Sequence, residues 1–278
     1  MNEELNKTSL DTICASLTYA MGIDPPAAAE KPNEALVSMI DSSLPGKKAD
    51  RIFMFNPDAI PQWILRKYPL LFKGLGDNED FLHVPLRTVM PSVTPVCFGT
   101  MYTGAQPSVH GIQKYEKPVI KLDSIFDAMI RAGKKAIILA TTNCSMSKIF
   151  LERDMDYFIG RNINEVNAKC AELIIKDEYD FIALYNGNYD SVMHKFGPES
   201  VEALGELRAN VETFLMYNVM IREHWKKHDT FIGFAMDHGA HAIDNHDEEN
   251  SKLGSHGLDM PEDLNITHFY TVKPAEAE

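Results

Sequence analysis

The sequence is poor in cysteine, and its four cysteines lie far apart. No two of them form a C-x-x-C pair, which argues against a thiolate metal site and against a disulfide scaffold. Isolated cysteines of this kind are typical of small buried hydrophobic residues. These four are Cys14, Cys97, Cys144 and Cys170.

Long hydrophobic segments are also missing. The longest apolar runs, such as 136–140 and 231–236, are too short to cross a bilayer, so we expect no membrane association. The first residues, MNEELNKTSLD, carry two glutamates where a secretory signal would carry positive charge and then an apolar region. We therefore expect a cytoplasmic protein.

Positive charge is scarce. The 27 basic residues are outnumbered by 40 acidic ones, which gives a net charge of −13 and disfavours binding to the long phosphate backbone of a nucleic acid. An anionic small-molecule substrate would need local cations. The ten histidines indicate that metal ions could supply them.

No proline- or glycine-rich linker, repeat or low-complexity segment divides the chain, and 45% of its residues are hydrophobic. We therefore expect one domain over 1–278, with a helical segment over 1–45 packed on the core and no large cap domain. The patterns predict strands at 51–56, 81–84, 136–140, 156–159, 181–185 and 231–236. Helices are expected within 7–22, 35–42, 60–68, 123–132, 164–175 and 201–225, and after residue 94. Continuous apolar strands that alternate with helices predict a three-layer α/β/α sandwich around a mostly parallel sheet.

Thr94 is the residue around which residues 85–115 are organised. Pro95 follows it directly, and proline is favoured in the first turn of a helix, so we expect Thr94 at the N-cap. The N-terminus of a helix can bind an anion such as phosphate. The alternative is that Thr94 only caps its helix.

Further polar residues follow the predicted strands, at the edge where parallel sheets bind their ligands. Each has a purely structural alternative: an aspartate in a turn, an Asp/His pair four residues apart on an ordinary surface, or a loop histidine. Asp237 and His238 are the most telling, because a carboxylate and an imidazole at the end of so apolar a strand must be solvated, paired or metal-bound. The set is Asp58, Asp190, His194, Asp237, His238 and His256.

Taken together, these carboxylates and imidazoles suit Zn²⁺ or Mn²⁺, and their number is sufficient for two ions. Two neighbouring metals can activate a nucleophile and hold a leaving oxygen during displacement at phosphorus. A threonine hydroxyl is a poor nucleophile unless its pKa is lowered, so the metals would also give Thr94 a catalytic role.

Four ordered motifs within 50–260 resemble the alkaline phosphatase superfamily, and most closely its nucleotide pyrophosphatase/phosphodiesterase branch. PSVTPVCFGTMYTGAQPSVHGI is similar to the nucleophile segment, with Thr94 at the nucleophile position. YNGNYDSVMHKFGP, AMDHGAH and GSHG are similar to the three segments that supply metal ligands. The resemblance implies one metal on Asp190, His194 and His256, and a second on Asp58, Asp237, His238 and the Thr94 oxygen. It further implies that Thr94 attacks phosphorus to form a covalent phospho-threonine.

The chain also departs from the pattern of that branch. The first strand ends FNPDA, where relatives usually have an Asp-Gly pair. Tyr115 stands where an asparagine usually donates to a phosphate oxygen, and its phenol could replace that amide or could serve only in packing. Long insertions between the motifs are absent, which predicts a stripped core with an open site.

The function expected from the sequence is therefore a two-zinc, or two-manganese, phosphohydrolase of the phosphodiesterase or nucleotide pyrophosphatase type, acting on a small phosphoester or nucleotide. Three alternatives use the same site: a phosphomonoesterase, a phosphonate hydrolase and a phosphomutase. A further alternative is a metal-binding protein that has lost its catalytic activity.

Overall fold

The computed structural model describes residues 4–243 and 252–276 and is built around a seven-stranded sheet, in the order β2-β9-β6-β1-β5-β3-β4. The strands of this sheet are β1 (Arg51–Pro57), β2 (Leu82–Arg87), β3 (Ala136–Thr141), β4 (Asp156–Gly160), β5 (Phe181–Asn186), β6 (Thr230–Phe234) and β9 (Asn265–Lys273). β1 pairs in parallel with β5 and β6, and β3 pairs in parallel with β4 and β5. β9 is antiparallel to both of its neighbours. The sheet is therefore mostly parallel, as predicted.

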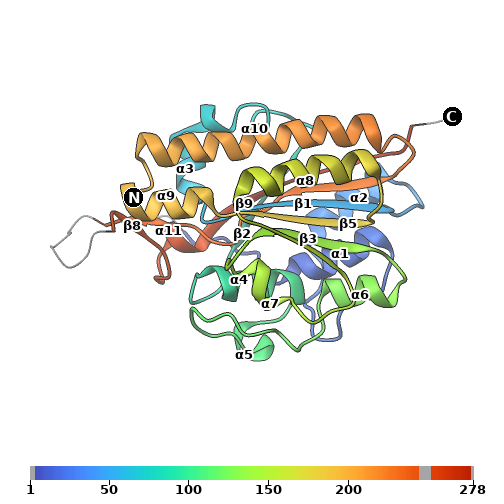
Figure 1. Ribbon diagram of the computed structural model, residues 1–278, viewed down its shortest axis with the longest axis horizontal. Helices are drawn as coiled ribbons and strands as arrows, with labels where there is room; N and C mark the ends of the chain where they lie inside the picture. Colours follow the sequence, from blue (N-terminus) through green and yellow to red (C-terminus); the bar gives the residue numbers. More distant parts are fainter. Residues whose placement is uncertain (1–3, 244–251, 277–278) are drawn as a thin grey trace.

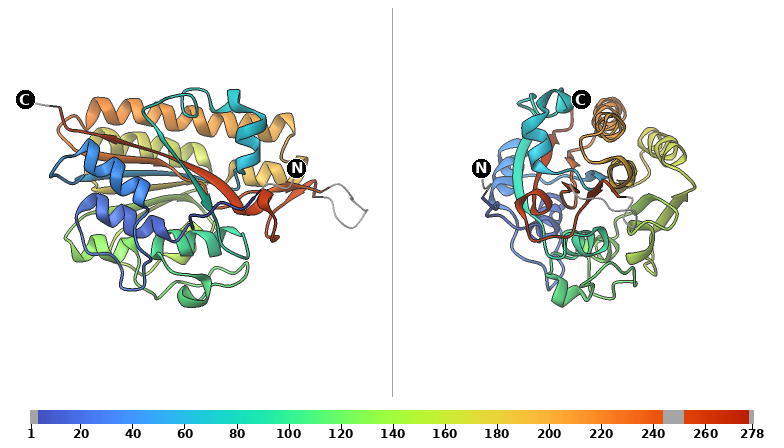
Figure 2. Two further views of the ribbon diagram at one scale, coloured as in Figure 1. Left: turned by 180° about the vertical axis from the view of Figure 1, so that it is seen from behind. Right: turned by 90° about the vertical axis from the view of Figure 1, so that its left-hand side faces the viewer.

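Helices cover both faces of the sheet (Figures 1 and 2). The helices are α1 (Thr12–Met21), α2 (Glu34–Ser43), α3 (Gln62–Lys67), the 3₁₀ helix η1 (Pro69–Phe72), α4 (Thr94–Thr103), α5 (Pro107–His110), α6 (Ile125–Arg131), α7 (Met146–Ile149), α8 (Ile163–Lys176), α9 (Asn188–Phe196), α10 (Val201–His224) and α11 (Pro261–Leu264). α8, α9 and α10 lie over one face, and α1, α4 and α6 lie over the other (Figure 1). This arrangement confirms the predicted three-layer sandwich.

The core consists of the apolar strands and the helix faces that cover them. Every residue of β5 and β6 is buried, which matches their uninterrupted apolar sequences and the helices on both sides. The amino-terminal helix α1 packs against α4 and α6, so the start of the chain forms part of one helical layer. Among the described residues, no helix combines the length and apolar character that a membrane span requires.

The start of α4 and the presence of β9 are two features that differ from the sequence expectation. The helix within the nucleophile segment, α4, begins at Thr94, and its N-cap is Val93, one residue earlier than predicted. Extended backbone at Val93 (φ −130°, ψ 146°) places the boundary there. The last strand, β9, was not predicted, although it lies between β2 and β6 within the sheet.

The carboxyl ends of β1, β5 and β6 lie at the same end of the sheet, on the left in Figure 1 near α9 and β8 (Gly254–Ser255). β8 pairs with β7 (His241–Ala242) in a separate two-stranded ribbon. The residues predicted to carry the chemistry follow these strands or lie beside the ribbon. The fold thus brings distant segments of the chain to one place.

Candidate metal centre

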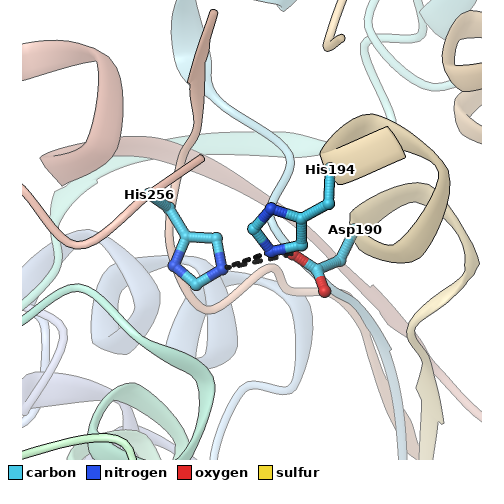
Figure 3. A group of neighbouring side chains, drawn as sticks. All are labelled: Asp190, His194 and His256. Atoms are coloured by element: carbon cyan, nitrogen blue, oxygen red, sulfur yellow. Dashed lines mark hydrogen bonds and ion pairs between the residues drawn. The ribbon is translucent and has the colours of Figure 1, made fainter. Parts of the chain in front are cut away.

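One group of side chains combines α9 with the segment after β8. We call it the first cluster: Asp190 and His194, one helical turn apart on α9, and His256 (Figure 3). Asp190 Oδ1 lies 3.3 Å from the Nε2 atom of each histidine. The two Nε2 atoms are 3.2 Å apart. All three residues therefore direct their ligand atoms to one point.

Backbone carbonyls orient both imidazoles of the first cluster. His194 Nδ1 lies 2.9 Å from the carbonyl oxygen of Gly254, and His256 Nδ1 lies 3.0 Å from that of Ser92. A carbonyl oxygen only accepts hydrogen bonds, so each Nδ1 carries a proton and each ring turns its Nε2 atom toward the other ring. Two bare nitrogens at this separation repel each other unless a proton or a metal ion lies between them. Metal-binding histidines are held in this way in many sites.

The second cluster is fully buried. It consists of Asp58, which follows β1, and Asp237 and His238, which follow β6. His238 Nε2 lies 3.4 Å from Asp58 Oδ1 and 3.3 Å from Asp237 Oδ2, and none of the three side chains is more than 1% exposed. His238 Nδ1 faces the carbonyl oxygen of Gly239 at 2.9 Å, so here too Nε2 is the atom left to bind a ligand.

Ala59, directly after Asp58, has a backbone conformation that favours glycine. Its backbone is left-handed, with a φ of 62°, a conformation that glycine adopts with less strain than alanine. The turn directs the Ala59 amide toward Asp237 Oδ1, which accepts its hydrogen bond at 3.2 Å. The strained residue thus fixes the second carboxylate of the cluster.

Thr94 lies beside the second cluster. Its hydroxyl donates to Asp58 Oδ2 at 3.3 Å and lies 3.4 Å from His238 Nε2. The side chain projects from the first residue of α4, a helix of ten buried residues, where the helix dipole favours an anion. Tyr185, at the end of β5, donates a short hydrogen bond to the same oxygen of Asp58.

Burial perturbs the ionisation of the second cluster. Desolvation, with repulsion from Asp190, raises the pKa of Asp58 to about 7. Desolvation and the negative charge of Asp58 raise the pKa of Asp237 well above its ordinary value. Desolvation also lowers the pKa of His238, which therefore stays neutral. A cation would relieve the repulsion between the two carboxylates.

The first cluster has the opposite electrostatic character because its carboxylate has two imidazole partners. Burial opposes ionisation of Asp190, but its close contacts with the imidazoles of His194 and His256 hold its pKa below the usual range. Burial disfavours the charged form of His256, yet Asp190 raises its pKa overall. The cluster is also more open, since Asp190 and His194 have side chains 19% and 21% exposed.

The donor sets fit divalent cations. Three carboxylate oxygens in the two clusters are buried without a hydrogen-bond partner: Asp58 Oδ1, Asp237 Oδ2 and Asp190 Oδ1. A buried, unsatisfied carboxylate oxygen is costly, whereas coordination to a metal would satisfy it. Each cluster offers carboxylate oxygen together with imidazole nitrogen, the ligand types that Zn²⁺ and Mn²⁺ accept. The two groups are therefore candidate metal sites.

The structure brings together seven of the eight site residues named from the sequence. The imidazoles of His238 and His256, which belong to different clusters, stack with ring centroids 4.1 Å apart, so the clusters adjoin. The eighth residue, Tyr115, is 62% exposed in the segment after α5, and the Lys117 amine lies 5.2 Å from its ring centre. Its proposed contact with phosphate stays a prediction.

Sequence reasoning missed Tyr185 and Asp263, whose side chains hold the site from outside. The available signal for Tyr185 was its position at the polar end of the apolar strand FIALYN. Asp263 carried no comparable signal, because it lies in a short helix beyond the last motif.

Comparison with known proteins gives a likeness of structure without a likeness of sequence. No protein-family model and no curated protein matches the chain. Murine ectonucleotide pyrophosphatase/phosphodiesterase 5 is similar in structure, with a TM-score of 0.62 and 15% identity over 80% of this chain and 88% of that one. An inactive threonine-to-alanine variant of the murine protein in complex with AMP gives a TM-score of 0.60 at 14% identity, over 80% and 88%. The human counterpart has a TM-score of 0.57 and 12% sequence identity, over 80% of this chain and 87% of that one.

The chain has the fold of the nucleotide pyrophosphatase/phosphodiesterases. The resemblance read from four short motifs is thus confirmed as a likeness of fold, which is alkaline phosphatase-like. At these low identities the comparison concerns the fold alone. The chemistry must be argued from the two clusters and Thr94.

Proposed function

We propose that this protein is a two-metal phosphohydrolase of the phosphodiesterase or nucleotide pyrophosphatase type, with Thr94 as its nucleophile. The observation that carries the proposal is the position of the Thr94 hydroxyl. It lies at the start of a buried helix, between Asp58 Oδ2 and His238 Nε2, beside carboxylate oxygens that lack hydrogen-bond donors. A purely structural cap would not require two adjoining clusters of metal-ligand residues beside it.

Each cluster would hold one ion. Asp190, His194 and His256 would bind the first, and Asp58, Asp237, His238 and the Thr94 oxygen would bind the second. We favour Zn²⁺ because imidazole nitrogens make up three of the seven proposed side-chain ligands, and Mn²⁺ is the alternative. The ions would supply positive charge that lowers the pKa of the nucleophile and stabilises negative charge on the phosphoryl and leaving oxygens.

The protein's own residues position the reaction. Thr94 Oγ forms a bond to phosphorus while the bond from phosphorus to the leaving oxygen breaks. Asp58 Oδ2, 3.3 Å from the hydroxyl, is the acceptor that faces its proton. Water then cleaves the phospho-threonine, which restores the Thr94 hydroxyl and releases phosphate or a phosphomonoester. The dipole of α4 favours the phosphoryl group at the helix N-terminus.

The substrate we propose is a small phosphodiester or a nucleotide pyrophosphate. The greater exposure of the first cluster leaves room for a leaving group on that side of the site. The AMP bound to the murine relative supports a nucleotide as one ligand class. Tyr115 is proposed to donate to a phosphate oxygen of the bound substrate, and Y115F would test that role as a loss of kcat with metal content unchanged.

The test compares Thr94→Ala and Thr94→Ser with the wild type, after each protein is loaded with Zn²⁺ or Mn²⁺. We expect T94A to keep both ions, measured by plasma emission, and to lose turnover of bis(p-nitrophenyl) phosphate. T94S keeps a hydroxyl and should keep part of the activity. Full activity in T94A would contradict the nucleophile assignment.

The wild-type substrate profile then separates the alternatives. Faster turnover of a monoester or a phosphonate than of a diester would favour the corresponding hydrolase, and transfer between two positions of one substrate would favour a mutase. Two bound ions without turnover of any of these compounds would favour a non-catalytic metal-binding protein.

A further inference from the structure

Asp263 is a buried carboxylate that contacts the backbone segments of both clusters without belonging to either. It lies on α11 and is 0% exposed. Its Oδ1 atom pairs with His241 Nδ1 at 2.7 Å, and its Oδ2 atom accepts a hydrogen bond from the Leu258 amide at 2.8 Å. Its carbonyl oxygen accepts from the Gly239 amide at 2.8 Å. One residue therefore binds the segment after His238 and the segment after His256.

The segment after His238 packs against α11 with no gap between the two backbones. A Cβ atom added to Gly239 would lie 2.1 Å from the carbonyl oxygen of Glu262, so the segment after His238 touches the backbone of α11 directly. On the other side, the ring centroids of His238 and His256 lie 4.1 Å apart, with the rings tilted by 31°. Any movement of one segment relative to the other would change the distance between the two clusters.

We propose that Asp263 is a positioning residue that sets the separation of the two metal sites. It does so by holding segment 239–241 and segment 256–258 at fixed places against α11. The proposal rests on the proposed function, because it assumes that both clusters bind metal. A carboxylate suits this task since its two oxygens can each accept a hydrogen bond, one from each segment. The amide of asparagine offers only one such oxygen.

His241 is the imidazole partner of Asp263. Its side chain is 14% exposed and reaches inward to Asp263. His241 contributes no ligand atom to either cluster. Its role in the proposal is to be the donor that ties segment 239–241 to Asp263.

The experiment measures metal affinity rather than turnover. Metal-free wild type, Asp263→Asn and His241→Ala are titrated with Co²⁺ and with Zn²⁺, and the visible absorption of Co²⁺ reports the geometry of each site. We expect D263N and H241A to bind one or both ions about 10- to 100-fold more weakly than the wild type, with an altered Co²⁺ spectrum. In both variants the ligand residues themselves are unchanged.

Two further variants make the test specific. His241→Asn places an amide donor near the position of Nδ1 and should restore most of the affinity that H241A loses. Asp127→Asn is the matched control, because Asp127 also accepts from a backbone amide, that of Ser124 at 2.9 Å, but lies on α6 and outside both clusters. D127N should bind both ions as the wild type does.

The outcomes separate this inference from the proposed function. If folded H241A or D263N binds both ions with wild-type affinity and spectrum, the positioning role is wrong. A wild-type protein that binds two ions but hydrolyses no phosphoester overturns the proposed function and leaves the titration of the variants decisive. Fewer than two ions on the wild type overturns both.

Discussion

Replacing Asp58 by asparagine should stabilise the metal-free protein, and the gain should grow as the pH rises. Asp58 is 1% exposed and lies beside Asp237, and desolvation together with repulsion from Asp190 outweighs the opposing influence of His256 on its pKa. Its pKa is raised from 3.8 to about 7, so the folded protein retains a proton that the unfolded chain has already released. Stability from this group is present at low pH and is lost as the pH rises from about 4 through about 7. Asparagine does not ionise, so D58N has no corresponding loss of stability as the pH rises.

The magnitude follows from the pKa and the chosen pH values. Each pKa unit corresponds to about 1.4 kcal/mol, so the stability difference between D58N and the wild type should increase by about 2 to 3 kcal/mol between pH 5 and pH 8. The histidines with lowered pKa, His110 and His268 among them, titrate in both proteins and cancel in the difference. Asp237 adds to the gain, because loss of the Asp58 charge makes its ionisation less costly.

The assay is equilibrium unfolding in urea at pH 5 and pH 8, with each protein first stripped by a chelator and then supplied with Zn²⁺. In the metal-free state D58N should be the more stable protein at pH 8. With saturating Zn²⁺ the order should reverse, since a ligand stabilises the state that binds it and D58N lacks a ligand of the second cluster. The reasoning is refuted if, without metal, the difference in unfolding free energy between D58N and the wild type stays constant or shrinks as the pH rises.

Two more predictions concern the surroundings of the clusters. Tyr185→Phe removes a donor from Asp58 and should weaken Zn²⁺ binding about 10- to 100-fold in a competition with a chelating dye. Its control is Tyr102→Phe, since Tyr102 is also buried but lies on α4 and donates to Asn56 Oδ1 of β1 at 2.6 Å; this variant should only lower the unfolding free energy by about 1 kcal/mol. Equal metal affinities in the two variants would contradict the role of Tyr185. Gly239→Ala places a methyl group against the Glu262 carbonyl and should lower the unfolding free energy by about 3 kcal/mol in urea, whereas an unchanged midpoint would show that the segment can move aside.

Much of the site was predictable because parallel strands end at one edge. Asp58, Asp190 and Asp237 each follow a continuous apolar strand or lie within a few residues of its end, and the fold then makes them neighbours. The sequence shows which residues follow strands. It does not need to show the contacts, since the topology of the sheet creates them.

β9 was missed because its pattern does not match that of a buried strand. NITHFYTVK mixes polar and apolar residues, yet nearly all of them are buried. His268 is accommodated by the carbonyl oxygen of Met236 at 2.6 Å and the Tyr270 hydroxyl at 2.7 Å, partners that local sequence cannot reveal. Its burial lowers its pKa to about 3, so it stays neutral inside the sheet layer.

Backbone carbonyl oxygens orient the candidate ligand histidines. All three candidate ligand histidines are oriented by carbonyl oxygens, two of which belong to Gly239 and Gly254. A Cβ on Gly239 would meet the Glu262 carbonyl at 2.1 Å, and a Cβ on Gly254 would meet the carbonyl of Met193 at 2.7 Å. Glycine is needed at both positions so that the main chain can approach closely enough. The glycines of AMDHGAH and GSHG are therefore explained by the packing that brings a carbonyl oxygen to the Nδ1 atom of a histidine and turns its Nε2 atom toward the metal site.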